Sequence, residues 1–316
     1  MSTPAKLAAF AATLAVLSGG GALAGGAINP ERGEPRATHS AAAAENEGAA
    51  HGAEQQEHET VSTSAHTETN THGASEEPAH PVRGLAVAEN GLRVVIDDPE
   101  LRQGRTERVR FRVVDERERT VRDFDVEHEK RMHLIIARRD LTGFQHLHPR
   151  QAADGSWTID VKLDEAGSYR LFADFATDDE PYTLAGDLRV DGRADLRPLP
   201  APSPTSVSDG GYDVRLSAGD AHPGQEAELR FSITKDGQAV HTEPYLGAGG
   251  HLVALREGDL AFLHVHPTDH GDGKSDEHDD SVGFAATFPT TGRYRLFLQF
   301  KHEGRVQTVA FTQEVK

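Results

Sequence analysis

The sequence predicts an all-β protein: two tandem immunoglobulin-like (cupredoxin-like) β-sandwich domains that follow a disordered N-terminal segment. Three observations support this fold class. Short runs of β-branched and aromatic residues, bounded by Gly, Pro, Asp or Asn, recur along residues 83–316, and no helical period interrupts them. Two blocks of sequence repeat in the same order. A Gly-x-Tyr triplet opens a late run in each block, as in the tyrosine corner of immunoglobulin-like domains.

The N-terminal residues 1–28 are predicted to be either a signal peptide or an uncleaved membrane anchor. Lys6 precedes an uncharged run from Leu7 to Ile28, and Ala22-Leu23-Ala24 offers the small-x-small pattern that signal peptidase recognises. The run is also about as long as a bilayer is thick, roughly 20 residues. Three consecutive glycines favour cleavage. In either case we expect an exported protein, located extracellularly or at the cell surface.

Residues 29–82 are predicted to form a disordered tether. Ala, Glu, Thr, Ser, Gly and Gln dominate the segment, which lacks the apolar surface needed to offset ordering. Its histidines follow no fixed chelate spacing, so they are either a loose metal-collecting tail or polar filler. They are His39, His51, His58, His66, His72 and His80.

The remainder is predicted to divide into repeat 1 (residues 83–193), a Pro-rich linker (194–208) and repeat 2 (209–316). The linker contains "RPLPAPSPTS", whose four prolines make a semi-rigid spacer. The predicted strands of repeat 1 are "GLRVVI", "RVRFRVV", "MHLIIARR", "WTIDVKL" and "YRLFADF". Those of repeat 2 are "YDVRLS", "AELRFSI", "HLVALR", "GFAATF", "YRLFLQF" and "QTVAFTQEV".

The two repeats align without a gap at an offset of 118 residues around a shared histidine pattern. Downstream, "GSYRLF" at Gly167 matches "GRYRLF" at Gly292 at an offset of 125, so repeat 2 carries a seven-residue insertion within "TDHGDGKSDEHDD". This pattern indicates a tandem duplication of one β-domain. The pairs matched at 118 are His133/His251, Leu134/Leu252, Arg138/Arg256, Phe144/Phe262, His146/His264, His148/His266 and Pro149/Pro267.

Three of these pairs are histidines, and they predict one metal site in each repeat. His133 opens a strand, and the return strand of the hairpin carries His146 and His148 on one face, because side chains alternate along a strand. Depending on the turn, His133 lies opposite His146 or, in a register two residues longer, opposite His148. Three convergent imidazoles suit zinc or copper. The equivalent triplet in repeat 2 is His251, His264 and His266.

An ordinary strand histidine, bonded to backbone or water, is the competing interpretation. Of the 17 aligned positions from His133 to Pro149, ten differ between the copies, yet all three histidines are among the seven retained. That retention favours the metal hypothesis. Neutral imidazole is the ligand, so affinity is expected to fall below about pH 6.5.

Four further residues are candidate auxiliary ligands: His128 and Glu129 on the approach to the first strand, and His270 and His278 in the insertion. The insertion itself is more simply a solvated acidic loop. Met132 precedes His133 and is predicted to be a core residue, since it points to the opposite face.

The amino-acid composition limits the kinds of partner and metal site that this protein can have. A net charge of −18 argues against nucleic acid, and the absence of cysteine excludes disulfides and thiolate metal sites. We expect a binding protein rather than an enzyme, with metal ions and another cell-envelope protein as candidate partners.

The main hypothesis is an extracytoplasmic copper or zinc protein for buffering, sequestration or handover. The alternatives are a non-metal β-sandwich module that docks a partner or ligand, and a His₃ metallohydrolase with Asp140 or Asp259 as base.

"EKRMHLIIARRDLTGFQHLHP" followed by "GSYRLFADF", and "YLGAGGHLVALREGDLAFLHVHP" followed by "GRYRLFLQF", resemble a known group of sequences. These are poorly characterised exported bacterial proteins labelled as heavy-metal-binding or copper-binding secreted proteins. The resemblance covers roughly residues 85–316 and implies an exported, duplicated β-domain that binds metal. The His-rich tether and the acidic insertion depart from it.

Overall fold

The computed structural model describes residues 82–263, 265–268 and 281–316, all within one compact unit, His72–Lys316. The predicted signal peptide or anchor and the six tether histidines lie outside these residues, as do His264, His270 and His278. Every regular element of the described chain is a β-strand. In that part of the chain, no helix has the length and hydrophobicity needed to cross a membrane.

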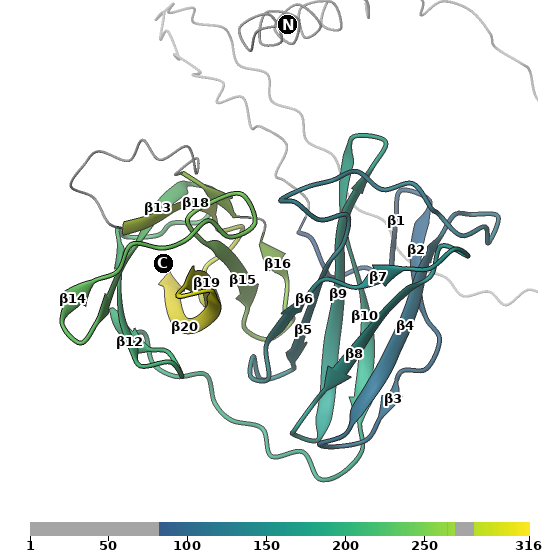
Figure 1. Ribbon diagram of the computed structural model, residues 1–316, viewed down its shortest axis with the longest axis horizontal. Coiled ribbons are helices and arrows are strands. Elements are labelled where there is room, and N and C mark those ends of the chain that lie inside the picture. Colours follow the sequence, from purple (N-terminus) through teal and green to yellow (C-terminus); the bar gives the residue numbers. More distant parts are fainter. Residues whose placement is uncertain (1–81, 264, 269–280) are drawn as a thin grey trace, which may run out of the picture. The chain divides into compact units, whose positions relative to one another are not determined.

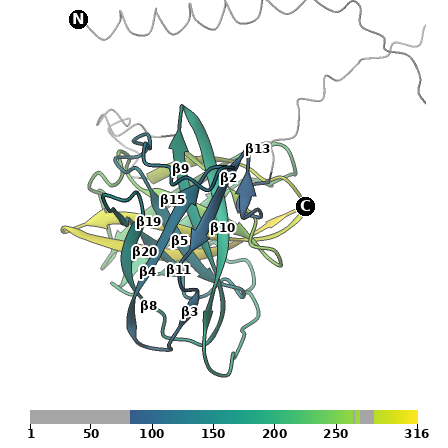
Figure 2. The ribbon, with the colours of Figure 1, turned by 90° about the vertical axis from the view of Figure 1, so that its right-hand side faces the viewer.

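Repeat 1 consists of two sheets, drawn in blue to teal in Figure 1. The first sheet has the order β1-β2-β4-β8-β7, and the second has the order β3-β10-β9-β5-β6. Strands β2, β4 and β8 run side by side across the front of Figure 2. The bounds are β1 Ala88–Glu89, β2 Leu92–Ile96, β3 Glu100–Leu101, β4 Thr106–Val114, β5 His133–Arg138, β6 Gln145–Leu147, β7 Arg150–Gln151, β8 Trp157–Lys162, β9 Gly167–Thr177 and β10 Glu180–Val190.

Repeat 2 has the same arrangement, with sheets β11-β12-β13-β18-β17 and β16-β15-β19-β20, and with β14 paired to β13. Ala221 bridges Val315 in parallel, as β3 pairs with β10 in parallel in repeat 1. The bounds are β11 Thr205–Val207, β12 Tyr212–Ala218, β13 Glu226–Lys235, β14 Gln238–Ala239, β15 His251–Arg256, β16 Phe262–Leu263, β17 His266–Pro267, β18 Ser281–Thr287, β19 Gly292–His302 and β20 Arg305–Val315.

This topology confirms the predicted fold class of tandem immunoglobulin-like sandwiches. In each repeat one sheet has the A-B-E-D order and the other the order of strands C, F and G. The tyrosine corner is present twice. The Tyr169 hydroxyl donates to the Glu165 carbonyl oxygen at 2.8 Å, and the Tyr294 hydroxyl donates to the Thr290 carbonyl oxygen at 3.0 Å.

Strand β10 is absent from the sequence prediction, although it pairs with β9 along its full length. Pro181 and Gly186 interrupt its hydrophobic alternation, and both residues ordinarily weaken a strand assignment. Gly186 is needed for packing between the sheets. A Cβ at this position would lie 2.7 Å from the Cδ1 atom of Ile96 on β2.

The two repeats pack together through the outer faces of their C, F and G sheets. Strand β5 is buried along its whole length, because its inner side chains enter the core of repeat 1 while Ile135 and Ala137 contact repeat 2. The residues of this inter-repeat cluster are Ile135, Ala137, Leu141, Phe172, Ala185, Leu199, Val253, Leu255, Leu260, Phe262 and Phe297, with Phe144 and Ala310 beside them. Double burial explains why "HLIIAR" and "HLVALR" lack alternation.

Equivalent residues make reciprocal contacts across this interface. Phe144 stacks on Phe297 with ring centroids 4.0 Å apart, and its counterpart Phe262 packs on Phe172 at 5.6 Å. In an isologous interface, residue i of one copy meets j of the other while j meets i. The two repeats therefore associate inside one chain with approximate two-fold symmetry.

The corner hydrogen bond gives a test of the fold. Replacing Tyr169 with Phe removes the buried hydroxyl that Glu165 accepts from, and we expect a loss of roughly 1 kcal/mol in the free energy of unfolding, measured by urea denaturation. Tyr182→Phe is the matched control on the neighbouring strand. An equal loss in both variants would contradict a special role for the corner.

Candidate metal centre

A tight turn places the chain next to the first histidine. The backbone of Glu127 and that of Lys130 exchange two hydrogen bonds, and the intervening His128 and Glu129 have φ of 45° and 66°. Two central residues with positive φ define a type I′ turn, which usually prefers Asn-Gly. Repeat 2 has the same turn at Leu246-Gly247, with φ of 55° and 81°. The turn carries the Glu127 carbonyl and the His128 ring toward β5.

The hairpin register decides which histidines face each other. Strand β5 pairs with β6 so that Ile135 lies opposite His146 and Leu134 lies opposite Leu147. The next pair is His133 opposite His148, which is the longer of the two registers that the sequence permits. His133 and His146 therefore lie on the same outer face, one diagonal step apart, with His148 directly across from His133.

The three histidines of repeat 1 converge as the spacing predicts. One ring nitrogen of each lies within 4.8 Å of the others. Nδ1 of His133 and Nε2 of His146 are 3.0 Å apart, and the ring centroid of His148 is 5.0 Å from that of His133 and 4.8 Å from that of His146. These three histidines are arranged so that they could hold one metal ion.

The outer nitrogens of two rings are already committed as donors. Nε2 of His133 donates to the Glu127 carbonyl oxygen at 3.1 Å, and Nδ1 of His146 donates to Oε1 of Gln299 at 2.7 Å. A neutral imidazole carries one proton, so the facing nitrogens of both rings present lone pairs to each other. Nε2 of His148 is buried and has no hydrogen-bond partner among the described residues.

Burial keeps these imidazoles neutral. His133 is 4 % exposed and His146 is 9 % exposed. Burial, followed by the neighbouring histidines, lowers the pKa of His146 to about 3 and the pKa of His148 to about 4, and burial also lowers the pKa of His133. The sequence expectation that affinity falls below about pH 6.5 stays a prediction, and burial is expected to move that fall to lower pH.

The other predicted ligands are distributed unequally. His251 lies at the site of repeat 1, with its ring centroid 4.7 Å from that of His146 and 5.9 Å from that of His133. His128 is at the margin, 6.0 Å from His251 by ring centroids. His266 is exposed on β17, which belongs to the other sheet, and Glu129 is also exposed.

The second triplet remains a prediction, because His264 lies outside the described residues. The same holds for the auxiliary roles of His270 and His278. Met132 is 1 % exposed and packs in the core of repeat 1, which confirms its prediction as a core residue.

Two polar residues beside the site were missed from sequence. Gln299 lies opposite His251 on β19, and Asp174 lies opposite His133 on β9, so they are equivalent at the 125-residue offset. Thr183 donates to Asp174 at 2.7 Å, and Gln299 donates to Thr308 at 3.2 Å. The offset alignment together with strand alternation would have placed both on the histidine face. Their contacts across the sheets needed the tertiary structure.

The carboxylates considered for a hydrolase are engaged elsewhere. Both oxygens of Asp140 accept from buried Arg138, and this arginine holds the pKa of Asp140 well below its usual range despite burial. Asp259 forms the equivalent pair with Arg256, which lowers its pKa. Carboxylates held as the anionic partners of arginine are weak proton acceptors. The hydrolase alternative therefore has no placed general base in Asp140 or Asp259.

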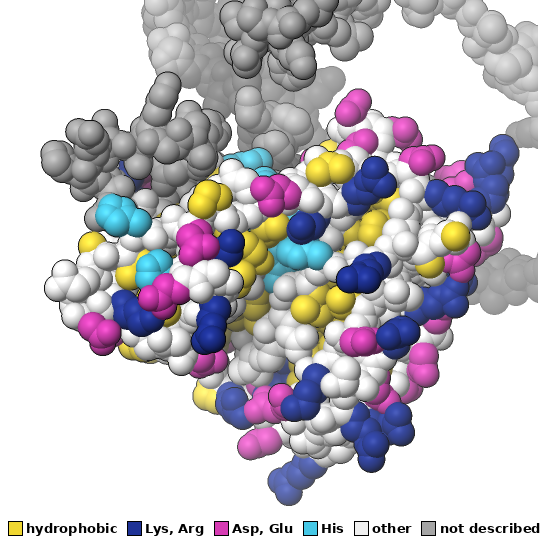
Figure 3. Space-filling model, viewed as in Figure 1, with side chains coloured by type: hydrophobic (Ala, Val, Ile, Leu, Met, Phe, Trp, Pro, Cys, Tyr) yellow, Lys and Arg dark blue, Asp and Glu magenta, His cyan; other side chains and the backbone are white. Residues whose placement is uncertain are grey.

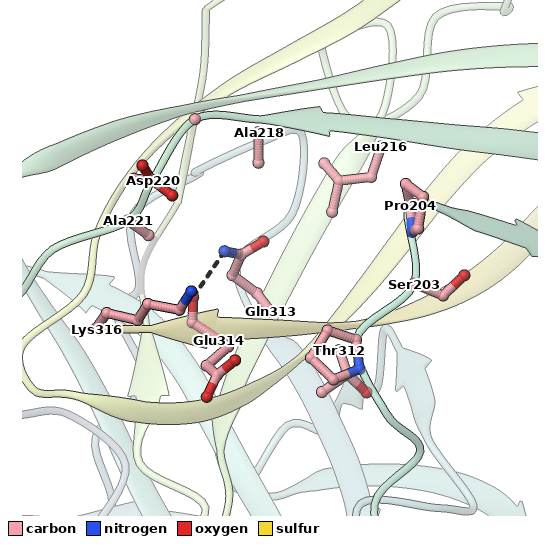
Figure 4. A pocket seen from close by; sticks show the side chains of 12 residues that line it. Ser203, Pro204, Leu216, Ala218, Asp220, Ala221, Thr312, Gln313, Glu314 and Lys316 are labelled. Atoms are coloured by element: carbon pink, nitrogen blue, oxygen red, sulfur yellow. Dashed lines mark hydrogen bonds between the residues drawn. The ribbon is translucent and has the colours of Figure 1, made fainter.

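A separate cavity of about 280 Å³ lies between the linker, the end of β12 and the end of β20 (Figure 4). Gln313 donates to the Glu314 carbonyl oxygen at 2.9 Å within it, and Asp220 and Lys316 stand at its edge. Its lining contains no histidine. Figure 3 shows histidine side chains at several separate places on the face that it draws, one of which is bordered by hydrophobic side chains.

The chain belongs to a family described as a domain of unknown function (DUF8832), whose model matches residues 86–192 and again residues 205–316. No curated protein matches the chain. The double match corresponds to the two sandwiches.

Several solved structures are similar at low identity. The Escherichia coli adhesin FdeC is 14 % identical, with 73 % of this chain and 66 % of that chain covered and a TM-score of 0.25. Salmonella alpha-2-macroglobulin is 14 % identical, with 75 % and 15 % covered and a TM-score of 0.26. The Yersinia pseudotuberculosis adhesin InvE is 12 % identical, with 71 % and 59 % covered and a TM-score of 0.23. This chain spans less than two thirds of each of these chains, and no argument about function follows from such scores.

The lowered pKa values predict acid sensitivity of the metal-free protein. Between pH 6.5 and 4 the unfolded chain binds protons that folded His146 and His148 refuse, so stability rises with pH across this window and is lost as pH falls. Each pKa unit by which a histidine is lowered corresponds to about 1.4 kcal/mol of stability lost at low pH. With a chelator present to remove metal ions, the urea concentration at the unfolding midpoint should fall as pH is lowered from 6.5 to 4. This fall should be less steep for His146→Gln than for the unmodified chain. Parallel curves would contradict the burial argument.

Proposed function

We propose that this protein binds one transition-metal ion, copper or zinc, through His133, His146 and His148. One observation carries the proposal: Nδ1 of His133 and Nε2 of His146 lie 3.0 Å apart, and one ring nitrogen of His148 lies within 4.8 Å of a ring nitrogen of each. Two lone pairs at this distance repel unless a cation lies between them. A proton is disfavoured because burial lowers the pKa of His133 and His146. A metal ion satisfies all three nitrogens.

The donor set fits such an ion. Tetrahedral coordination with metal–nitrogen distances of 2.0–2.1 Å separates the ligand nitrogens by about 3.3 Å, within the range that these histidines span. Ligating histidines usually donate their second ring nitrogen to a carbonyl or carboxylate oxygen. His133 does so to Glu127 and His146 does so to Gln299. His148, which is half-buried, is the ring nearest to solvent.

An all-imidazole site suits copper and zinc alike, and the ion is the cargo of a buffering, sequestering or handover protein in this proposal. The predicted N-terminal signal peptide or membrane anchor and the resemblance to exported metal-binding proteins support a location outside the cytoplasm. The six tether histidines would add a second, looser means of collecting metal ions. Asp140 and Asp259 are held by arginines, which favours binding over hydrolysis.

The triad can be tested by removing one ligand at a time. The background should carry glutamine at the six tether histidines and at His270 and His278, so that only folded sites are titrated. In this background we expect His148→Ala to abolish tight binding of Zn(II) or Cu(II), measured by competition with a chromophoric chelator. His222→Ala, which removes an exposed histidine far along the chain, is the matched control. Equal affinity in both variants would refute the site.

Gln299 provides a second test, because it contacts a ligand without binding the ion. Gln299→Leu removes the acceptor of the His146 Nδ1 proton and should weaken metal affinity by roughly 10-fold to 100-fold with unchanged stoichiometry. Gln307→Leu is the control on the adjacent strand β20. If Gln299→Leu leaves affinity unchanged, the Gln299 contact does not orient a ligand.

A second candidate function is a structural or partner-binding β-sandwich module without metal. The observation that favours it is that the contacts of the histidine site also connect repeat 1 to repeat 2. Glu127, His133, His146 and Gln299 form a continuous chain from one sandwich to the other, beside the apolar inter-repeat cluster. The histidines could then act only as a polar joint. An unmodified protein that binds neither Zn(II) nor Cu(II) tightly, but whose His146→Ala variant is destabilised, would favour this function.

A further inference from the structure

We infer that His251 of repeat 2 supplies a fourth imidazole to the same ion, so that one metal ion is held jointly by both repeats and fastens their interface. This inference rests on the proposed function of the triad. It differs from that function in stoichiometry and in consequence, because it predicts one shared ion where two independent triplets predict two.

The symmetry of the interface brings His251 to this place. His133 and His251 are equivalent residues, each at the start of the C strand of its repeat and on the outer face of its sheet. Near the axis of an isologous interface, equivalent residues approach each other. Their rings accordingly stack at 5.9 Å between centroids with an interplanar angle of 6°. The reciprocal pairs Phe144 on Phe297 and Phe262 on Phe172 flank the same axis.

The ring of His251 is as close to that of His146 as the triad rings are to each other, and it is farther, at 5.9 Å, from that of His133. The ring centroids of the triad are separated by 5.3, 5.0 and 4.8 Å, and the centroid of His251 is 4.7 Å from that of His146. Joining the ion requires His251 to turn a ring nitrogen toward the three ligand nitrogens, and its ring is the nearest histidine ring of repeat 2 to His146 among those that the structure describes. Three protein ligands leave a fourth position open on zinc, and here an imidazole from the other repeat stands beside it.

The same residues already connect the repeats at this point. Gln299, which accepts from His146, is the direct neighbour of His251 on the adjacent strand β19. Repeat 2 therefore orients one ligand and offers another. Gly250 permits the close approach of these strands, since a Cβ there would lie 2.9 Å from the Gln299 carbonyl oxygen.

A shared ion links metal binding to the stability of the joined repeats. An ion that binds only the packed arrangement stabilises it by mass action, by an amount that grows with metal concentration relative to Kd. The thermal midpoint should therefore rise with Zn(II) in the unmodified chain. The rise should be smaller in His251→Ala, although its triad is intact.

The test uses the full chain in the glutamine background, with Co(II) as a spectroscopic probe and Zn(II) for affinity. We expect one ion per chain, intense four-coordinate Co(II) bands, and in His251→Gly a Kd raised by at least about tenfold with weaker bands. Added free imidazole should restore the bands, which a merely misfolded variant would not allow. His266→Ala, in the same repeat and exposed, is the matched control and should behave as the unmodified chain.

The outcomes separate the two proposals. If the unmodified chain binds no ion, the proposed function itself fails. If it binds two ions and both His251→Gly and His266→Ala remove one of them, the repeats hold independent sites and the shared ion is overturned. If one ion binds with the same affinity and spectrum in His251→Gly, the triad stands and His251 is not a ligand.

Discussion

The packing of the two repeats through the outer faces of their C, F and G sheets is the constraint on which the rest of the structure depends. An immunoglobulin-like sandwich needs only its inner faces to be apolar, because the outer faces meet water. Here β5 and β15 are covered on both sides, one by their own core and the other by the opposite repeat. That second covering buries His133 and His146, which would otherwise lie on a protein surface. Their burial lowers the pKa values of both imidazoles.

The chemistry of the site follows from that burial. In water His133, His146 and His148 would each titrate near 6.5 and form ordinary hydrogen bonds. At the interface between the repeats, burial favours the neutral form of His133 and His146. Their hydrogen bonds to the oxygens of Glu127 and Gln299 determine which ring nitrogen carries the proton. The remaining lone pairs point toward one another. These nitrogens are the ones that the proposed metal ion would bind.

Much of the fold could be predicted from sequence, because strand signals are local. Alternation in "RVRFRVV", the turn residues and the two Gly-x-Tyr corners identify the sandwiches, and duplication identifies the equivalent histidines. Strand β10 was not predicted, because Pro181 and Gly186 interrupt its hydrophobic alternation. The need for glycine at position 186 becomes clear only in the structure, where Ile96 packs against it. Asp174 and Gln299 were not predicted as residues of the site, because the sequence around them does not indicate that they lie beside histidines of other strands.

The sequence by itself determined the all-β class, the duplication, the shared face of His146 and His148, and the assignment of Met132 to the core, since these depend on periodicity and on comparison of one repeat with the other. Only the tertiary structure decided the hairpin register, the burial of the triad and the unequal positions of His251 and His266. Those properties arise where two sheets of different repeats meet, and the physical reason is that contacts across such an interface depend on the packing of whole faces rather than on the local pattern of either strand.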